Sequence, residues 1–96
     1  MAQLLTEAEI QVQVHALPHW TVHNGALHIT RKFKDFIEAV TFVNQLVNPS
    51  EAAAHHPDIA ISYNKVSLTL TTHDAGGLTQ KDFDLAKVIS QIISST

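Results

Sequence analysis

Apolar residues recur along the chain with two different periods, and the switches between them predict the order of the elements. Ile10 and Val14 are spaced four apart behind a Thr6/Glu9 pair, which has the pattern of a capping box. This combination predicts a helix over residues 6–15. The first element is therefore expected to be a short helix with one apolar side.

The next segment alternates apolar with polar residues, as a half-buried strand does. Trp20 and Val22 precede Asn24-Gly25, the strongest short signal for a two-residue hairpin turn. A turn at this pair places Val22 opposite Leu27 on one face of the ladder. We therefore expect two antiparallel strands that share a buried face.

Helical spacing returns between residues 35 and 47. The expected buried stripe has four positions, widened by two neighbours: Phe36, Val40, Val43, Val47, Ile37 and Ala39. Asn48-Pro49 interrupts this helix, because proline loses a hydrogen bond in a helix interior but fits the first turn of a new helix. We expect a kink or restart here, with Asn48 as the cap.

A second hairpin is predicted after Pro57, which biases the residue before it away from helical angles. Alternating apolar residues lie on both sides of an Asn64-Lys65 turn: Ile59, Ile61 and Tyr63 before it, and Val66, Leu68 and Leu70 after it. Alternation on both arms predicts that all six side chains lie on one buried face.

A Thr79/Asp82 capping pair opens the last helix, whose apolar stripe is Leu85, Ile89, Ile92 and Ile93. The resulting order is α-β-β-α-β-β-α, without the crossovers of a parallel sheet. It predicts an α+β fold, with a four-stranded antiparallel sheet and helices packed on one face, in a single domain over residues 1–96. Pairing one sheet edge with a second subunit would cover an exposed edge.

Composition restricts the class of protein. The 96 residues carry a net charge of −3, and the six Lys and Arg are scattered, which argues against direct nucleic-acid binding. No stretch has the length of a membrane span, and the first residues lack the pattern of a signal peptide. The absence of cysteine excludes a disulfide framework, so we expect a cytoplasmic protein.

Titratable residues gather in the second half of the chain: Glu51, His55, His56, His73 and Asp82. Histidine both donates and accepts protons near neutrality, so the cluster suggests proton-transfer chemistry. A zinc hydratase is a rival interpretation, but the adjacent histidines lack the spacing that aims two imidazoles at one ion. We expect no metal and no cofactor.

Each of these residues also has a plainer structural interpretation. Glu51 lies near the positive end of a restarted helix, and Asp82 is the acidic partner of a helix cap. His55 and His56 could form a polar helix exit. The four remaining histidines are interpreted as surface residues: His15, His19, His23 and His28.

Several segments in register resemble the pterin-4a-carbinolamine dehydratase family: Glu51–Pro57 (E-x-x-x-H-H-P), Tyr63–Val66 (Y-N-K-V), Thr72-His73, Gly77–Thr79 (G-L-T) and Asp82–Ala86. The resemblance extends over nearly the whole chain after the first helix. It implies a hydro-lyase that converts 4a-hydroxytetrahydropterin to quinonoid dihydropterin and water, in tetrahydrobiopterin recycling. Neither a redox agent nor a metal takes part in this reaction.

The resemblance implies three catalytic histidines and two supporting acids: His55, His56, His73, Glu51 and Asp82. Our hypothesis is that His55 and His73 exchange the two protons, while His56, with Thr72 and His73, binds the pterin. Glu51 lies one helical turn before His55 and is expected to fix its imidazole.

The family resemblance also leaves a second function open. Relatives of this fold serve as dimerisation or assembly cofactors of other proteins, so a non-catalytic role with a protein partner is the alternative. The resemblance further implies a homodimer or homotetramer. The chain departs from the family pattern at Asn48-Pro49-Ser50, which interrupts the helix before Glu51, and at Arg31, where an aromatic residue is usual.

Overall fold

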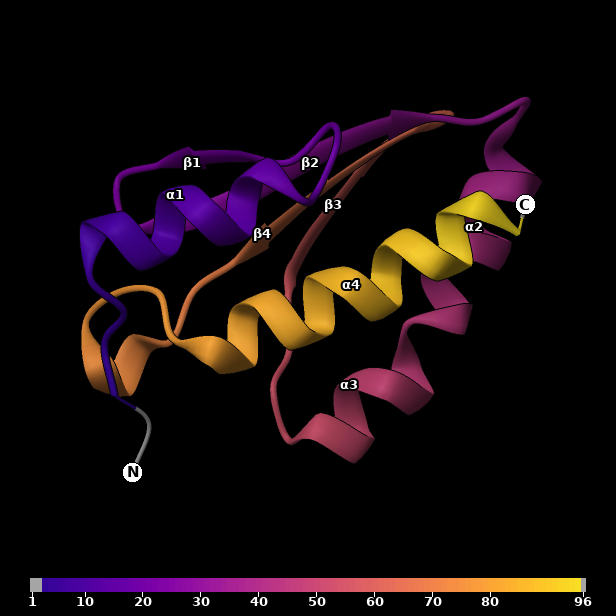
Figure 1. Ribbon diagram of the computed structural model, residues 1–96. Coiled ribbons are helices and arrows are strands. Elements are labelled where there is room, and N and C mark those ends of the chain that lie inside the picture. The colour runs from indigo at the N-terminus through magenta and orange to yellow at the C-terminus, as the bar shows by residue number, and fades with distance from the viewer. Residues whose placement is uncertain (1–2, 96) are drawn as a thin grey trace.

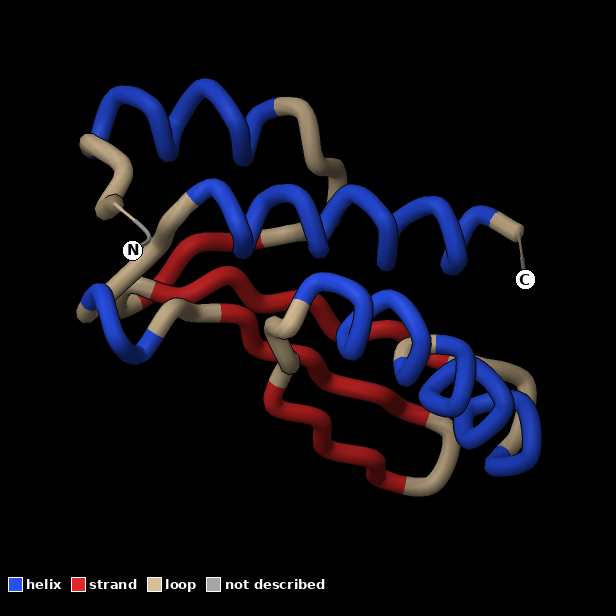
Figure 2. Tube along the Cα trace, turned by 90° about the horizontal axis from the view of Figure 1, so that it is seen from below, coloured by secondary structure: helices blue, strands red, loops and turns tan. Residues whose placement is uncertain are grey.

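The computed structural model describes residues 3–95, which form a four-stranded antiparallel sheet with the helices on one of its faces (Figures 1 and 2). The elements in chain order are α1 Glu7–His15, β1 Thr21–His23, β2 Ala26–Lys32, α2 Phe36–Gln45, α3 Val47–Ala53, β3 Asp58–Ser62, β4 Lys65–Leu70, the 3₁₀ turn η1 His73–Ala75 and α4 Gln80–Ser94. The strand order is β1-β2-β4-β3. The predicted α+β class and order are confirmed, with the central helix divided into α2 and α3.

The first helix and first hairpin form as their sequences predict. Glu9 N–H donates to Thr6 Oγ1 at 3.2 Å, and Thr6 N–H donates to Glu9 Oε1 at 2.8 Å, which completes the capping box. Val22 pairs with Leu27 across the hairpin. Asn24 and the glycine after it have φ of 51° and 72°, the left-handed angles that this turn requires.

The middle helix buries a stripe that coincides with the predicted one only at Ala39. The residues that face the core are Ala39, Phe42 and Leu46, whereas Phe36 and Ile37 are 52% and 75% exposed. The centre of the buried stripe lies one residue, about 100° around the helix, from the four positions predicted as its centre. Apolar residues occupy both stripes, and packing decides between them, because the Phe42 ring contacts a phenylalanine at the end of β2 with centroids 4.9 Å apart.

The predicted restart occurs, but its cap is different. Helix α3 begins at Val47 after Leu46, and no side chain caps it, so the assignment of Asn48 as the cap is wrong. Pro49 is the third residue of α3. Because the first four N–H groups of a helix have no intrahelical partner, proline breaks no hydrogen bond there.

The second hairpin turns one residue earlier than predicted. Tyr63, with φ of 55°, and Asn64 form the turn in place of Asn64-Lys65. Asn64 connects the turn to the end of β2: its side-chain amide donates to the Phe33 carbonyl at 2.9 Å, and its own carbonyl accepts from Phe33 N–H at 2.7 Å. These tertiary hydrogen bonds fix the position of the turn.

Strand β3 lies at an edge of the sheet and stays exposed. The prediction of a buried face is correct for Val66 and its β4 neighbours but wrong for Ile59, Ile61 and Tyr63, which are 42%, 39% and 67% exposed. Ile59 pairs with Leu68 in the central strand, so it lies on the helix-bearing face. In a single chain the helices do not cover this edge.

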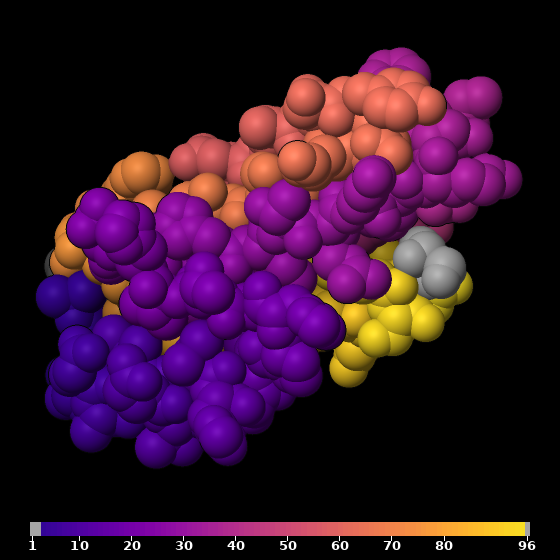
Figure 3. Space-filling model, turned by 90° about the horizontal axis from the view of Figure 1, so that it is seen from above, coloured from indigo at the N-terminus to yellow at the C-terminus, as the bar shows by residue number. Residues whose placement is uncertain are grey.

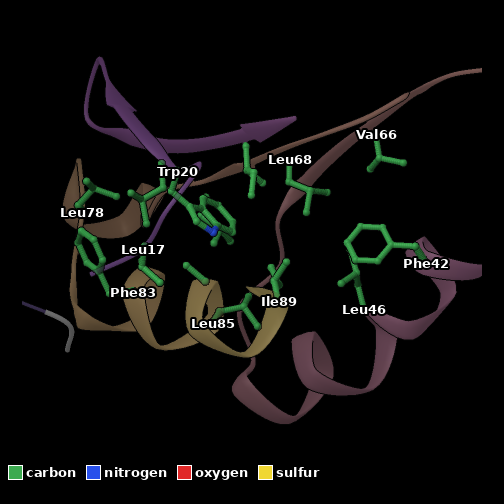
Figure 4. Packing of buried hydrophobic residues seen from close by; sticks show 14 of the residues in the cluster. Leu17, Trp20, Phe42, Leu46, Val66, Leu68, Leu78, Phe83, Leu85 and Ile89 are labelled. Carbon is green, nitrogen blue, oxygen red and sulfur yellow. The ribbon is translucent and has the colours of Figure 1, made fainter. Parts of the chain in front are cut away.

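The core lies between the sheet and the helices (Figure 4), and Trp20 lies in it beside α4. Trp20 Nε1–H donates to Ser90 Oγ at 2.8 Å. Leu27, Leu70 and Phe83 are fully buried, and burial of such a side chain stabilises a fold by about 1.5–3 kcal/mol. Strand residues reach the surface on the face shown in Figure 3. No helix within residues 3–95 has the length and apolar character needed to cross a bilayer.

Candidate active site

Side chains from two distant segments of the chain meet in one cleft of about 280 Å³. Its lining comprises Ala54, His55, His56, Thr71, Thr72, His73, Asp74 and Lys81. Three other clefts are larger, at about 540, 430 and 370 Å³, but none of them is lined by any of the three predicted site histidines. The cleft of about 280 Å³ is therefore the one that contains all three predicted site histidines.

The end of α3 directs the paired histidines into this cleft. Ala54 adopts φ 50° and ψ 40°, a left-handed conformation that ends the helix. Such a conformation costs a residue with a Cβ about 1–2 kcal/mol. Hydrogen bonds offset that cost, as Ala54 N–H donates to Glu51 O at 3.2 Å and His55 N–H donates to Ser50 O at 3.1 Å. The chain therefore turns sharply immediately before His55.

The imidazole of His55 is held by a buried carboxylate. His55 Nε2 lies 2.5 Å from Asp82 Oδ1, and the two side chains are 11% and 0% exposed. Asp82 Oδ2 accepts from Thr72 Oγ1–H at 2.8 Å and from Thr79 N–H at 2.9 Å. Every oxygen of the buried carboxylate thus has a partner, as burial requires. Because Asp82 can only accept, Nε2 carries the proton and Nδ1 is left to act as a base.

Glu51 pairs with the other member of the histidine pair. His56 Nε2 lies 2.5 Å from Glu51 Oε2, with side chains 60% and 69% exposed. The prediction that Glu51 holds His55 is therefore wrong. Helix α3 ends before His55, so the geometry that joins positions four apart on a helix is lost. An exposed pair of this kind contributes about 0–1 kcal/mol.

The loop that carries His73 into the cleft is short, and a hydrogen bond joins its two ends. Thr72 N–H donates to Gly77 O at 3.0 Å, and Gly76 between them has φ of 80°, which glycine adopts without strain. His73 is exposed, and its ring has no hydrogen bond to a residue in the range 3–95. The hydroxyl of Thr72, a predicted substrate contact, is already engaged with Asp82 and lies 2.8 Å from Thr79 Oγ1.

Three further polar residues line the cleft that were not predicted from the sequence: Thr71, Asp74 and Lys81. A signal for Lys81 existed, because a lysine in the first turn of a helix opposes the helix dipole and so needs another reason to be there. Across residues 3–95 no three His, Asp or Glu side chains form a group that could hold a metal ion.

A family model and several known relatives match almost the whole of this chain. The family model described as "Pterin 4 alpha carbinolamine dehydratase" matches residues 3–92. A protein of Trichormus variabilis is 70% identical over 96% of this chain and 99% of its own length. One of Cyanothece sp. is 68% identical over 96% and 95%. Both carry the name "Putative pterin-4-alpha-carbinolamine dehydratase".

Two known structures share the fold. The crystal structure of a "transcriptional coactivator/pterin dehydratase" from Brucella melitensis has a TM-score of 0.88 and 36% identity, covering 92% of this chain and 96% of that one. A "pterin dehydratase-like protein" described as a RuBisCO assembly factor has a TM-score of 0.64 and 19% identity over 80% and 89%, which is a likeness of fold alone. The chain belongs to the pterin-4-alpha-carbinolamine dehydratase family.

Proposed function

We propose that this protein dehydrates 4a-hydroxytetrahydropterin to quinonoid dihydropterin and water in the cytoplasm, as a step of tetrahydrobiopterin recycling. The observation that carries the proposal is the shared cleft of His55, His56 and His73, in which His55 is backed by a fully buried carboxylate. Membership of the family supports the same reaction. The polar lining suits a flat, polar heterocycle.

The reaction needs one proton delivered and one removed. The C4a–O bond breaks as the hydroxyl takes a proton and leaves as water, while the ring nitrogen loses its proton and forms a C=N bond. His55 Nδ1, backed by Asp82, accepts the proton from nitrogen, and protonated His73 delivers a proton to the oxygen. His56, held by Glu51, binds the pterin edge. Positioned acids and bases of this kind accelerate reactions by about 10²–10⁴-fold.

The test is turnover of freshly generated carbinolamine by purified variants. Single His55→Ala and His73→Ala variants are expected to lose about 10²-fold or more in kcat while their circular dichroism stays that of the wild type. His15→Ala is the matched control, since His15 is exposed at the end of α1, outside the cleft. Full activity in the His55→Ala, His73→Ala double variant would rule the assignment out.

A non-catalytic role in assembly of another protein is the second candidate. The observation that favours it is the exposed apolar edge formed by Ile59, Ile61 and Tyr63, together with a fold shared with an assembly factor. Turnover without capture of a partner supports the enzyme alone, whereas capture without turnover supports the assembly role. The same edge supports a homodimer or homotetramer, since pairing of β3 with a second copy would bury it.

A further inference from the structure

A second cleft, of about 430 Å³, shares no residue with the histidine site. It lies between β2 and the last turns of α4, at the opposite end of that helix from Lys81. In Figure 3 the end of α4, in yellow, comes to the surface beside purple atoms of the first third of the chain. Its polar lining is Arg31, His19, Ser90 and Ser94, and none of its lining residues is a carboxylate.

The side chain of Arg31 has no hydrogen-bond acceptor among the described residues that line this cleft. Arg31 lies two residues after buried Ile29 in β2 and is paired with buried Val66 of β4. Its side chain is therefore on the same, helix-bearing face of the sheet. Its Nε is buried without a hydrogen-bond partner. Among residues 3–95 both ion pairs join a histidine to an acid, so no carboxylate of this part of the chain forms an ion pair with the guanidinium. Leaving a buried charged donor unpaired is costly, unless a ligand supplies the acceptor.

Other donors face the same space. Ser90 Oγ accepts from Trp20 Nε1–H at 2.8 Å, so the hydroxyl proton of Ser90 is left to donate elsewhere. The imidazole of His19 lines the cleft and adds a further donor. The residues that line this cleft thus include one cation and two further donors but no acid. The combination is complementary to an anion.

We propose that this cleft binds a small oxyanion, a phosphate or carboxylate group, through Arg31, with Ser90 and His19 as additional donors. The planar guanidinium presents paired N–H groups that match two oxygens of such a group. On binding, the guanidinium turns outward so that Nε also gains an acceptor. The partial negative charge at the C-terminal end of α4 opposes an anion, so the expected affinity is millimolar.

The test is titration of the full chain with sodium phosphate and, separately, sodium succinate, with chloride keeping the ionic strength constant. Binding is followed by calorimetry and by the backbone amide signals of Arg31 and Ser90 in ¹H–¹⁵N spectra. We expect saturable binding of at least one anion. A response to phosphate alone assigns a phosphate site, and a response to succinate alone assigns a carboxylate site.

Arg31→Met removes the guanidinium and keeps an apolar stem, and it is expected to weaken binding about tenfold or more. Lys32→Met is the matched control, because it removes the same charge from the next, exposed residue of β2. Equal binding by Arg31→Met and wild type would overturn the proposal. The proposal would also be overturned if the Arg31 and Ser90 amide signals of the wild type did not shift with either anion at tens of millimolar. This second test uses only the wild-type protein, so it does not depend on whether a variant folds.

Discussion

Asp82→Asn separates the two tasks of the buried carboxylate with almost no change of shape. In the wild type its oxygens accept from three groups: His55 Nε2, Thr72 Oγ1 and Thr79 N. Asparagine offers one accepting oxygen and an NH₂ group that can only donate. If the oxygen keeps Thr79 N–H, the NH₂ group faces His55, and the imidazole must then accept at Nε2 and carry its proton on Nδ1.

The cost in stability follows from the hydrogen bonds. A hydrogen bond to a charged group contributes about 1.5–3 kcal/mol and a neutral one about 0.5–1.5 kcal/mol, so each of three bonds weakens by roughly 1 kcal/mol. The amide avoids burial of a charge, which offsets part of this loss. We expect the free energy of unfolding to fall by about 1–3 kcal/mol, which leaves a folded protein.

The cost in activity is expected to be larger. Reversing the tautomer of His55 removes the base from the cleft, and loss of a positioned base lowers kcat by about 10²–10⁴-fold. Both quantities are measurable on one preparation, by urea unfolding and by turnover of freshly generated carbinolamine.

Asp84→Asn is the control for this substitution. Asp84 is exposed two residues further along α4 and accepts only from Gln80 Nε2, at 2.9 Å. If Asp82→Asn turned over substrate as fast as Asp84→Asn, the carboxylate would be a helix cap and nothing more. The role assigned to the His55–Asp82 pair would then be refuted.

Two further predictions concern assembly and pH. Ile61→Lys puts a charge on the exposed β3 edge and is expected to lower the oligomeric state measured by light scattering, whereas a monomeric wild type would contradict edge pairing. In α1, the Thr6 backbone N–H and then its hydroxyl lower the pKa of Glu9 below its ordinary value of 4.5. Its contribution to stability is present above pH 4.5 and is lost as the pH falls through the lowered pKa. The free energy of urea unfolding of Glu9→Gln should lack this pH-dependent contribution. Identical stability–pH profiles for Glu9→Gln and the wild type would refute the prediction.

The features that the sequence predicts well are those decided by neighbouring residues. The Thr6/Glu9 capping box, the Asn24-Gly25 turn and the alternation of β4 all depend on contacts within a few positions, and all three are confirmed. The α2 stripe depends instead on which of two apolar faces packs better. That choice requires knowledge of the Phe42 environment, which only the folded chain provides.

The candidate site likewise contains one part that the sequence predicts and one that it does not. Motif spacing identified the three histidines, and all of them line one cleft. The acidic partner of His55 differs from the predicted one, because Glu51 could reach His55 only if the helix continued to His55. The left-handed Ala54 ends that helix, and the partner of His55 comes from α4, 27 positions away. Pairing across such a distance is set by tertiary packing and leaves no local signal.

The dual attachment of Asp82 has a consequence for reading relatives of this protein. The same carboxylate begins α4 through Thr79 N–H and holds His55, so a relative without activity would still need it to start the helix. An aspartate at this position is therefore a poor marker of catalytic competence. On the proposed mechanism His73 is the more informative residue when an assembly protein has to be told from an enzyme, because it is exposed and its ring makes no hydrogen bond within residues 3–95.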